Sequence, residues 1–218
     1  MCMMGKKIKK VVFLAIFLLL AGFVVINLSG CARPIPRNSD NICLIFKQYP
    51  DWYWDASRAR RRWGVPISVL MAIIHQESHF SAGAKPPREK LLWVIPWFRP
   101  TSAYGYSQAV NQTWKRYQKD TGHTSVFTRR NAFGDAVDFI GWFANQAHIR
   151  AGISKVNAYT LYLAYHEGIG GYTRGTYKNK AWLIAVAKKV QRRAWIYRSQ
   201  LRVCEASLPK KPWWHVWE

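Results

Sequence analysis

A glutamate, Glu77, lies at the end of an almost wholly apolar run, and its position predicts acid–base chemistry. It follows Val69 by eight residues and Ile73 by four, so on a helix the three side chains share one stripe. Burial on such a stripe disfavours the carboxylate and raises its pKa, as a general acid working near neutral pH requires. The alternative from this feature alone is a glutamate at a helix end that points to solvent or pairs with an arginine.

Two histidines beside this glutamate, His75 and His79, suggest zinc binding as a second chemistry, because histidines four apart on a helix can share one ion. A zinc protease of this type needs its glutamate one residue after the first histidine. Glu77 comes two residues after it, about 200° around the helix. The sequence also lacks a Gly-x-Ser-x-Gly motif. We therefore expect no metal, no cofactor and no side-chain nucleophile.

The elements that position these residues are expected to be mainly helical, because apolar residues recur at spacings of three and four. The helix of Glu77 opens at Val65-Pro66 and is apolar on all sides through Ile74, which predicts that it is buried. Three glycines are expected to end helices: Gly64, Gly122 and Gly152. The other predicted helices span 42–49, 50–64, 107–119, 132–150, 157–166 and 179–204.

Residues 85–101 combine several prolines with two tryptophans and are expected to be irregular. Long loops in compact domains are often functional. This segment is expected to be either an insertion or lid beside the site, or a loop whose aromatic residues cover the core.

The first thirty residues are expected to be a targeting segment rather than part of the folded domain. Four lysines precede an apolar run over residues 11–26, which is typical of a signal peptide. Leu28-Ser29-Gly30-Cys31 resembles a bacterial lipobox, in which the cysteine is lipidated and becomes the new N-terminus. Ala32 after it resembles lipoproteins sent to the periplasmic face of the outer membrane. An uncleaved transmembrane helix is the alternative. Under either interpretation the rest of the chain is exported and lies in the cell envelope.

The rest of the chain is strongly basic. Without the four lysines of the targeting segment it has 29 basic and 11 acidic residues, a net charge of +18. Such a surface attracts polyanions, which after export are wall peptides, acidic polymers and lipid head groups. Nucleic acid is not an expected partner, because the chain has no zinc-finger spacing or RNA-binding signature and carries an export signal. No feature of the sequence indicates a protein partner.

Two cysteines, Cys43 and Cys204, remain after Cys2 leaves with the signal and Cys31 takes lipid. In a compartment that permits disulfides they are expected to pair and to join the first mature helix to the last. Two buried free thiols are the alternative. The expected organisation is a signal peptide 1–30, a tether 31–40, one domain 41–206 and a Trp/Lys-rich tail 207–218. This tail is expected either to lie on an anionic membrane or to fold back over the domain.

Three motifs, in this order, resemble those of the soluble lytic transglycosylases of the lysozyme-like superfamily. Residues 74–80 (IHQESHF) resemble the first, where a buried helix ends in Glu-Ser and the glutamate is catalytic. Residues 103–108 (AYGYSQ) and 163–168 (LAYHEG) resemble the second and third. The resemblance covers residues 60–200. It implies a mainly α (α+β lysozyme-like) fold, a single compact helical domain with a glycan cleft.

The resemblance also implies a reaction, cleavage of the β-1,4 bond between N-acetylmuramic acid and N-acetylglucosamine in peptidoglycan with formation of 1,6-anhydromuramic acid ends. Glu77 would protonate the glycosidic oxygen and then accept the proton of the 6-hydroxyl. Ser78 would orient the Glu77 carboxyl group. Four residues would shape the cleft: Tyr104, Gly105, Gln108 and Tyr165.

Two departures from the family pattern bear on this mechanism. Ser107 stands where the family usually has an apolar residue, which affects local packing, and His166-Glu167 stands where it usually has Asn-Ala. Glu167 is therefore expected near the site as a substrate-binding residue that affects how the sugar is held. It also keeps open a goose-type lysozyme-like hydrolase, in which this residue or an aspartate positions water. A wall-binding lipoprotein without catalytic activity is the third hypothesis.

Overall fold

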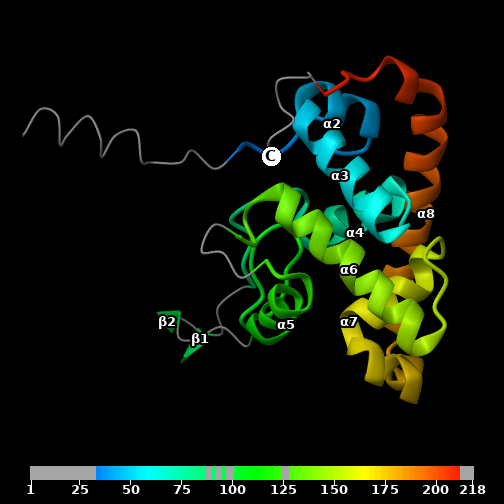
Figure 1. Ribbon diagram of the computed structural model, residues 1–218. Helices are drawn as coiled ribbons and strands as arrows, with labels where there is room; N and C mark the ends of the chain where they lie inside the picture. Colours follow the sequence, from blue (N-terminus) through cyan, green and yellow to red (C-terminus); the bar gives the residue numbers. More distant parts are fainter. Residues whose placement is uncertain (1–32, 87–89, 92–94, 97–100, 124–127, 212–218) are drawn as a thin grey trace, which may run out of the picture. The chain divides into compact units, whose positions relative to one another are not determined.

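The computed structural model describes residues 33–86, 90–91, 95–96, 101–123 and 128–211 (Figure 1). The chain divides into two compact units, Met1–Arg33 and Pro34–Glu218, and every described helix and strand lies in the second. These elements are α2 (Ile42–Gln48), α3 (Pro50–Trp63), α4 (Ile67–Ser78), β1 (Lys90–Leu91), β2 (Ile95–Pro96), α5 (Asn111–Thr121), α6 (Phe133–Ala151), α7 (Ala158–Arg174), the 3-10 helix η1 (Thr176–Asn179), α8 (Ala181–Cys204) and the 3-10 helix η2 (Glu205–Ser207).

α4 forms the buried centre of this unit. Ten of its twelve residues are buried, and it contacts α3, α6, α7 and α8. The expectation that a helix apolar on all sides is buried is confirmed. Each fully buried large apolar side chain contributes about 1.5–3 kcal/mol relative to exposure, so α4 is a rigid base for the residues at its end.

The predicted helix ends at Gly64, Gly122 and Gly152 are confirmed, since each glycine is a left-handed C-cap. Two helices differ from the prediction. The helix expected over 107–119 begins at Asn111, and the helix expected over 157–166 continues to Arg174 across a kink at Gly168. Residues 85–101, expected to be irregular, include the antiparallel pair β1–β2.

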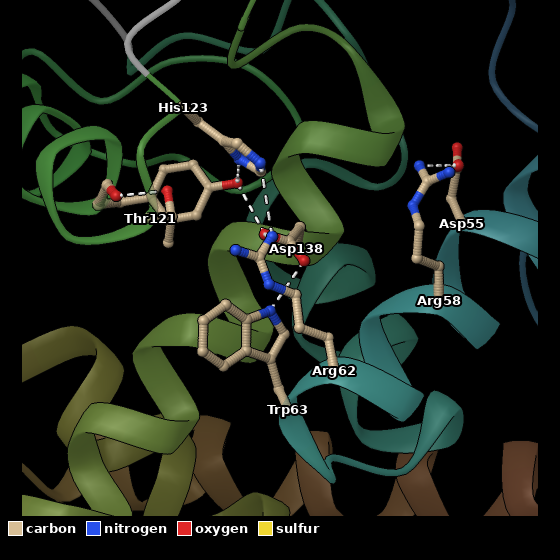
Figure 2. Close-up of polar contacts among 8 residues, drawn as sticks. Asp55, Arg58, Arg62, Trp63, Thr121, His123 and Asp138 are labelled. Carbon is tan, nitrogen blue, oxygen red and sulfur yellow. Dashed lines mark hydrogen bonds and ion pairs between the residues drawn. The ribbon is translucent and has the colours of Figure 1, made fainter. Parts of the chain in front are cut away.

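A buried aspartate, Asp138 on α6, joins three helices. Trp63 Nε1 donates to its Oδ1 at 2.8 Å, and the Tyr117 hydroxyl donates to its Oδ2 at 2.9 Å. Arg62 Nη1 forms an ion pair with Oδ2 at 3.1 Å. Figure 2 shows Arg62 and Trp63 converging on Asp138, with His123 close by. Because a buried carboxylate is costly unless it is paired and hydrogen-bonded, these bonds fix α3 and α5 against α6.

The expected disulfide is confirmed, because Cys43 of α2 is bonded to Cys204 at the end of α8. The chain before α2, assigned to the tether, also contacts the domain. Pro36 is buried, the Tyr49 hydroxyl donates to the Pro34 carbonyl at 2.8 Å, and the Tyr197 hydroxyl donates to the Ser39 carbonyl. Residues 34–40 therefore lie along the helices that the disulfide joins.

The first residues of the tail fold back over the domain. Leu208 is buried, and Trp54 Nε1 donates to the Pro209 carbonyl at 2.8 Å. Residues 212–218, including the tail tryptophans, and the targeting segment with Cys31 lie outside the described residues. Among the described helices, none has the length and hydropathy of a membrane span.

Candidate active site

Glu77 lies in the last turn of α4. Part of the residue is open to solvent, while protein atoms surround its carboxyl group. This burial raises the pKa of Glu77 to about 7, and a hydrogen bond from the Tyr162 hydroxyl partly opposes the rise because it stabilises the carboxylate. A carboxyl group with this pKa is present in both protonation states near neutral pH. It can therefore donate a proton and accept one in the same reaction.

The chain turns sharply just after Glu77, and buried packing holds the turn. His79 and Phe80 both have positive φ, 49° and 64°, which is unfavourable for residues with a side chain. Phe80 is fully buried, with its ring centroid 5.8 Å from that of Trp52 and 5.8 Å from that of His75. The packing of Phe80 thus maintains a strained turn and fixes the end of α4.

Two tyrosines of α7 lie beside the glutamate. The Tyr165 hydroxyl donates to the Ser107 carbonyl at 2.6 Å, and its ring centroid lies 4.9 Å from that of Phe143. Burial, and then the negative charge of Glu77, raise the pKa values of both Tyr162 and Tyr165 above their usual range. Both hydroxyls therefore stay protonated. The structure brings the three predicted motifs together, with Glu77 from the first, Ser107 from the second and Tyr165 from the third.

Tyr162 was not expected from the sequence. It lies three residues before Tyr165, and residues three apart share a helix face, so the signal was present once Tyr165 was assigned to the cleft. Its hydroxyl is the hydrogen-bond donor to Glu77. This residue therefore joins the candidate site.

The second motif is a tight turn that Gly105 makes possible. Gly105 has φ +76°, and a Cβ there would lie 2.1 Å from the Arg130 carbonyl oxygen. Gln108 also has positive φ, and its Nε2 donates to the carbonyls of Ala84 and Gly105 at 2.9 and 2.8 Å. The Gln108 amide thus ties the turn to Ala84, in the chain that follows the first motif. Its predicted contact with glycan stays a prediction.

Tyr104 lies at the start of this turn, half-buried between two cations. Lys85 Nζ is 5.2 Å and the Arg130 guanidinium carbon 5.5 Å from the centroid of its ring. Such contacts are favourable by about 0.5–1 kcal/mol at exposed sites. They hold the ring in place, and the expected cleft role of Tyr104 remains a prediction.

The two serines of the motifs have different surroundings. The Ser78 hydroxyl donates to the Ile74 carbonyl at 3.2 Å, within α4, so its expected contact with the Glu77 carboxyl group stays a prediction. Ser107 is fully buried, and within the described residues its hydroxyl has no hydrogen-bond partner. A lone buried hydroxyl is unfavourable, as expected for a polar residue at a usually apolar position.

Glu167 is engaged in a network of its own. Lys180 Nζ lies 2.8 and 3.0 Å from its two carboxylate oxygens, the Thr176 hydroxyl donates to Oε2, and His166 Nδ1 lies 3.1 Å from Oε1. The hydrogen bonds from Lys180 and then Thr176 lower the pKa of Glu167 to about 2. The next residue, Gly168, has φ 73° and ψ 155° and kinks α7. Glu167 is thus an anion that ties the kink to η1 and the start of α8.

A comparison with protein families identifies the family of this chain. Residues 18–204 match the family described as transglycosylase SLT domain. The chain is a member of that family. A comparison with curated protein sequences finds no match. The mainly α, lysozyme-like fold expected from the motifs is confirmed, and membership of the SLT family indicates lytic transglycosylase activity on peptidoglycan.

A pocket of about 320 Å³ adjoins the tyrosines of the SLT domain. Its lining comes from α5, α6 and the kink of α7, and includes Phe143, which contacts Tyr165, and Gly168. Trp142, Arg116 and Arg150 also line it. The pocket provides an apolar wall and two cations, and Phe143 links it to Tyr165.

His75 on α4 and His79, the residue that caps α4, lie away from Glu77. They line a second pocket together with Ala72 and Gln76, and residues with these spacings share a helix face. Glu77 is about 100° from Gln76 on the same helix. The two histidines therefore face a different region from the glutamate.

Proposed function

We propose that the chain is a peptidoglycan lytic transglycosylase that cleaves the β-1,4 bond between N-acetylmuramic acid and N-acetylglucosamine and leaves 1,6-anhydromuramic acid ends. The observation that carries this proposal is the surrounded carboxyl group of Glu77, whose pKa burial raises to about 7. Because burial rather than a neighbouring charge causes the rise, the group can exchange its proton without disrupting an ion pair.

In the proposed reaction, protonated Glu77 donates its proton to the glycosidic oxygen. The bond from C1 of the muramic acid to that oxygen breaks, and an oxocarbenium-like centre develops at C1. The 6-hydroxyl oxygen of the same sugar then bonds to C1, and Glu77, now ionised, takes the hydroxyl proton. The enzyme returns to its starting state without a water molecule or a second carboxylate. The hydrogen bond from Tyr162 supports the ionised intermediate state of Glu77.

The hydrolase alternative needs a residue that positions water. Glu167 or an aspartate was the carboxylate expected for this role, and the oxygens of Glu167 already accept hydrogen bonds from Lys180, Thr176 and His166. A carboxylate whose pKa is about 2 is also a poor base near neutral pH. These contacts favour a structural role for Glu167 and support the transglycosylase.

The test is incubation of the purified chain with isolated sacculi, followed by mass analysis of the released fragments. We expect anhydro ends from the wild type and no fragments from Glu77→Gln, because the amide can neither donate nor accept the proton. General acid–base catalysis contributes about 10²–10⁴-fold. Glu167→Gln is the matched control and should still release anhydro ends. Reducing ends from the wild type would favour the hydrolase, and sacculus binding without any fragments would favour a non-catalytic wall-binding protein.

We also propose that Cys31 is lipidated and holds the domain at the periplasmic face of the outer membrane. The support is the Leu28-Ser29-Gly30-Cys31 sequence after the apolar run. Cys31→Ala should leave the precursor unprocessed and free of label in cells fed a radioactive fatty acid. Normal labelling of this variant would contradict the proposal.

A further inference from the structure

The solvent-facing side of α8 combines cations with large apolar side chains. The helix has six basic residues and no acidic residue. Its buried side consists of Leu183, Ala187, Val190, Ala194, Tyr197 and Leu201. On the other side Trp195 is 62%, Ile196 43% and Val203 85% exposed, next to exposed Lys188, Lys189 and Arg192. A helix face of charges alone is usually only solvated, whereas exposed aromatic and aliphatic side chains among cations are typical of interfacial membrane helices.

A basic pocket lies between this face and α4. It has a volume of about 400 Å³, and its lining includes Lys189, Arg192, Arg193 and Ile196 from α8. Arg193 is paired with Asp40 at 2.6 Å. Within the described residues no carboxylate lies within ion-pair distance of Lys189 or Arg192. The pocket therefore offers two cations to an anionic group such as a phosphate.

The N-terminal end of the domain lies at the same helix. Gln200 Nε2 of α8 donates to the Asp40 carbonyl at 3.1 Å, and two nearby aliphatic residues, Ile35 and Leu44, are 50% and 44% exposed. Leu44 follows Cys43, whose disulfide partner Cys204 follows Val203. Pro34 is the third residue after Cys31, so the two are about 10 Å apart at most. Any membrane attachment at Cys31 would thus hold the domain by this side.

We infer that the exposed face of α8, with Leu44 of α2, lies on an anionic phospholipid bilayer. Trp195, Ile196 and Val203 enter the interfacial region, where tryptophan is favoured. The basic residues pair with head-group phosphates, and the α4–α8 pocket holds one of them. On α4 the residues that line this pocket lie on a different side of the helix from Glu77, so a bilayer against α8 would not cover the side of α4 that carries Glu77. The inference goes beyond the proposed glycan cleavage and rests in part on the proposed attachment at Cys31.

The experiment uses the full chain reconstituted with vesicles of neutral phosphatidylcholine or of phosphatidylcholine with phosphatidylglycerol. Flotation reports attachment, and hydroxyl-radical footprinting with mass analysis reports the exposure of Trp195, with Ile149 of α6, 67% exposed, as the internal reference. We expect at least about fivefold lower reactivity of Trp195 in the anionic vesicles than in the neutral ones. This factor of about five is the change in the membrane-contact equilibrium that a single lysine or arginine near an anionic surface contributes. In neutral vesicles Trp195 should stay reactive.

A matched pair of variants removes three positive charges each. Replacing Lys188, Lys189 and Arg192 by glutamine should abolish the protection of Trp195. Replacing Lys115, Lys119 and Lys178, which are exposed on α5 and η1, by glutamine should leave the protection unchanged. Equal loss in both variants would show a general charge effect and overturn the inference. Cleavage of sacculi by these variants tests the proposed function separately.

The remaining outcomes are also decisive. If the protein floats with both vesicle types and Trp195 is equally reactive in both, the bilayer contact of α8 is overturned, while membrane attachment at Cys31 still stands. Flotation with anionic vesicles alone, lost in the α8 variant, would support the contact without an anchor. No flotation at all would reject both. Soluble anionic wall peptides can be added to the protein in neutral vesicles. If they protect Trp195 as strongly as anionic vesicles do, the exposed face of α8 binds the cell wall instead of the bilayer.

Discussion

The buried glutamate should make the stability of the domain depend on pH in a way that Glu77→Gln removes. The pKa of Glu77 rises from 4.5 to about 7 on folding, and each unit corresponds to about 1.4 kcal/mol. Ionisation of this carboxyl group therefore costs the folded state about 3 kcal/mol, an upper limit because part of the residue meets solvent. The variant keeps the shape of the side chain and has no charge to bury.

The sign follows from the direction of the shift. The folded state holds the proton of Glu77 more tightly than the unfolded state, so the contribution of Glu77 to the free energy of unfolding is largest below pH 4.5, falls as the pH rises to about 7, and is then level. Relative to the wild type, Glu77→Gln should gain up to about 3 kcal/mol between these two values.

The assay is urea unfolding followed by circular dichroism at several pH values from 4.5 to 8, with the disulfide intact. Glu167→Gln is the control. The pKa of Glu167 is lowered to about 2, so its contribution is present above its unfolded pKa and is lost only as the pH falls below this range. A difference between Glu77→Gln and the wild type that does not change from pH 4.5 to 8 would refute the assigned burial of Glu77.

Three further outcomes are expected. Gly105→Ala should lower the free energy of unfolding by more than about 1 kcal/mol and should also lower sacculus cleavage, because the new Cβ would lie 2.1 Å from the Arg130 carbonyl oxygen. The control is Gly122→Ala, where φ is similar and the space around the new Cβ is open, and equal effects of the two variants would contradict the reasoning. Asp138→Ala should lower the free energy of unfolding in urea by about 3 kcal/mol, since Arg62, Trp63 and Tyr117 lose their acceptor. The control Asp120→Ala, which removes a surface ion pair with Arg116, should lower it by less than about 1 kcal/mol. Replacing Cys43 and Cys204 by serine should lower the stability by about 2–5 kcal/mol in the same assay, and an unchanged urea midpoint would show that the bond is dispensable.

The sequence was most informative where one residue type has one local consequence. A glycine after a helix stops it, so three helix ends were predictable, and the almost wholly apolar run before Glu77 correctly predicted a buried helix. The Asp138 network could not be predicted, because an aspartate in a helix usually lies on the surface and its partners come from α3 and α5. Before α5, which begins later than predicted, Gln108 has positive φ and its amide donates to the carbonyl of Ala84, 24 residues earlier in the chain.

The site shows the same division. Glu77 and Tyr165 were predicted as site residues from the motifs that contain them, whereas the part played by Glu167 depends on Lys180, thirteen residues later. A sequence motif gives a residue's neighbours along the chain. The partners that decide whether a carboxylate is a base or a structural anion come from the folded chain.

The disulfide between Cys43 and Cys204 also has a mechanical consequence. The two cysteines are 161 residues apart and lie near the two ends of the domain. Tension applied between the chain before Cys43 and the chain after Cys204 would pass through this single covalent bond, and the helices between them, α4 with Glu77 included, would carry none of it. A pull on both ends of the protein would therefore leave the geometry around Glu77 unstretched until the bond is reduced.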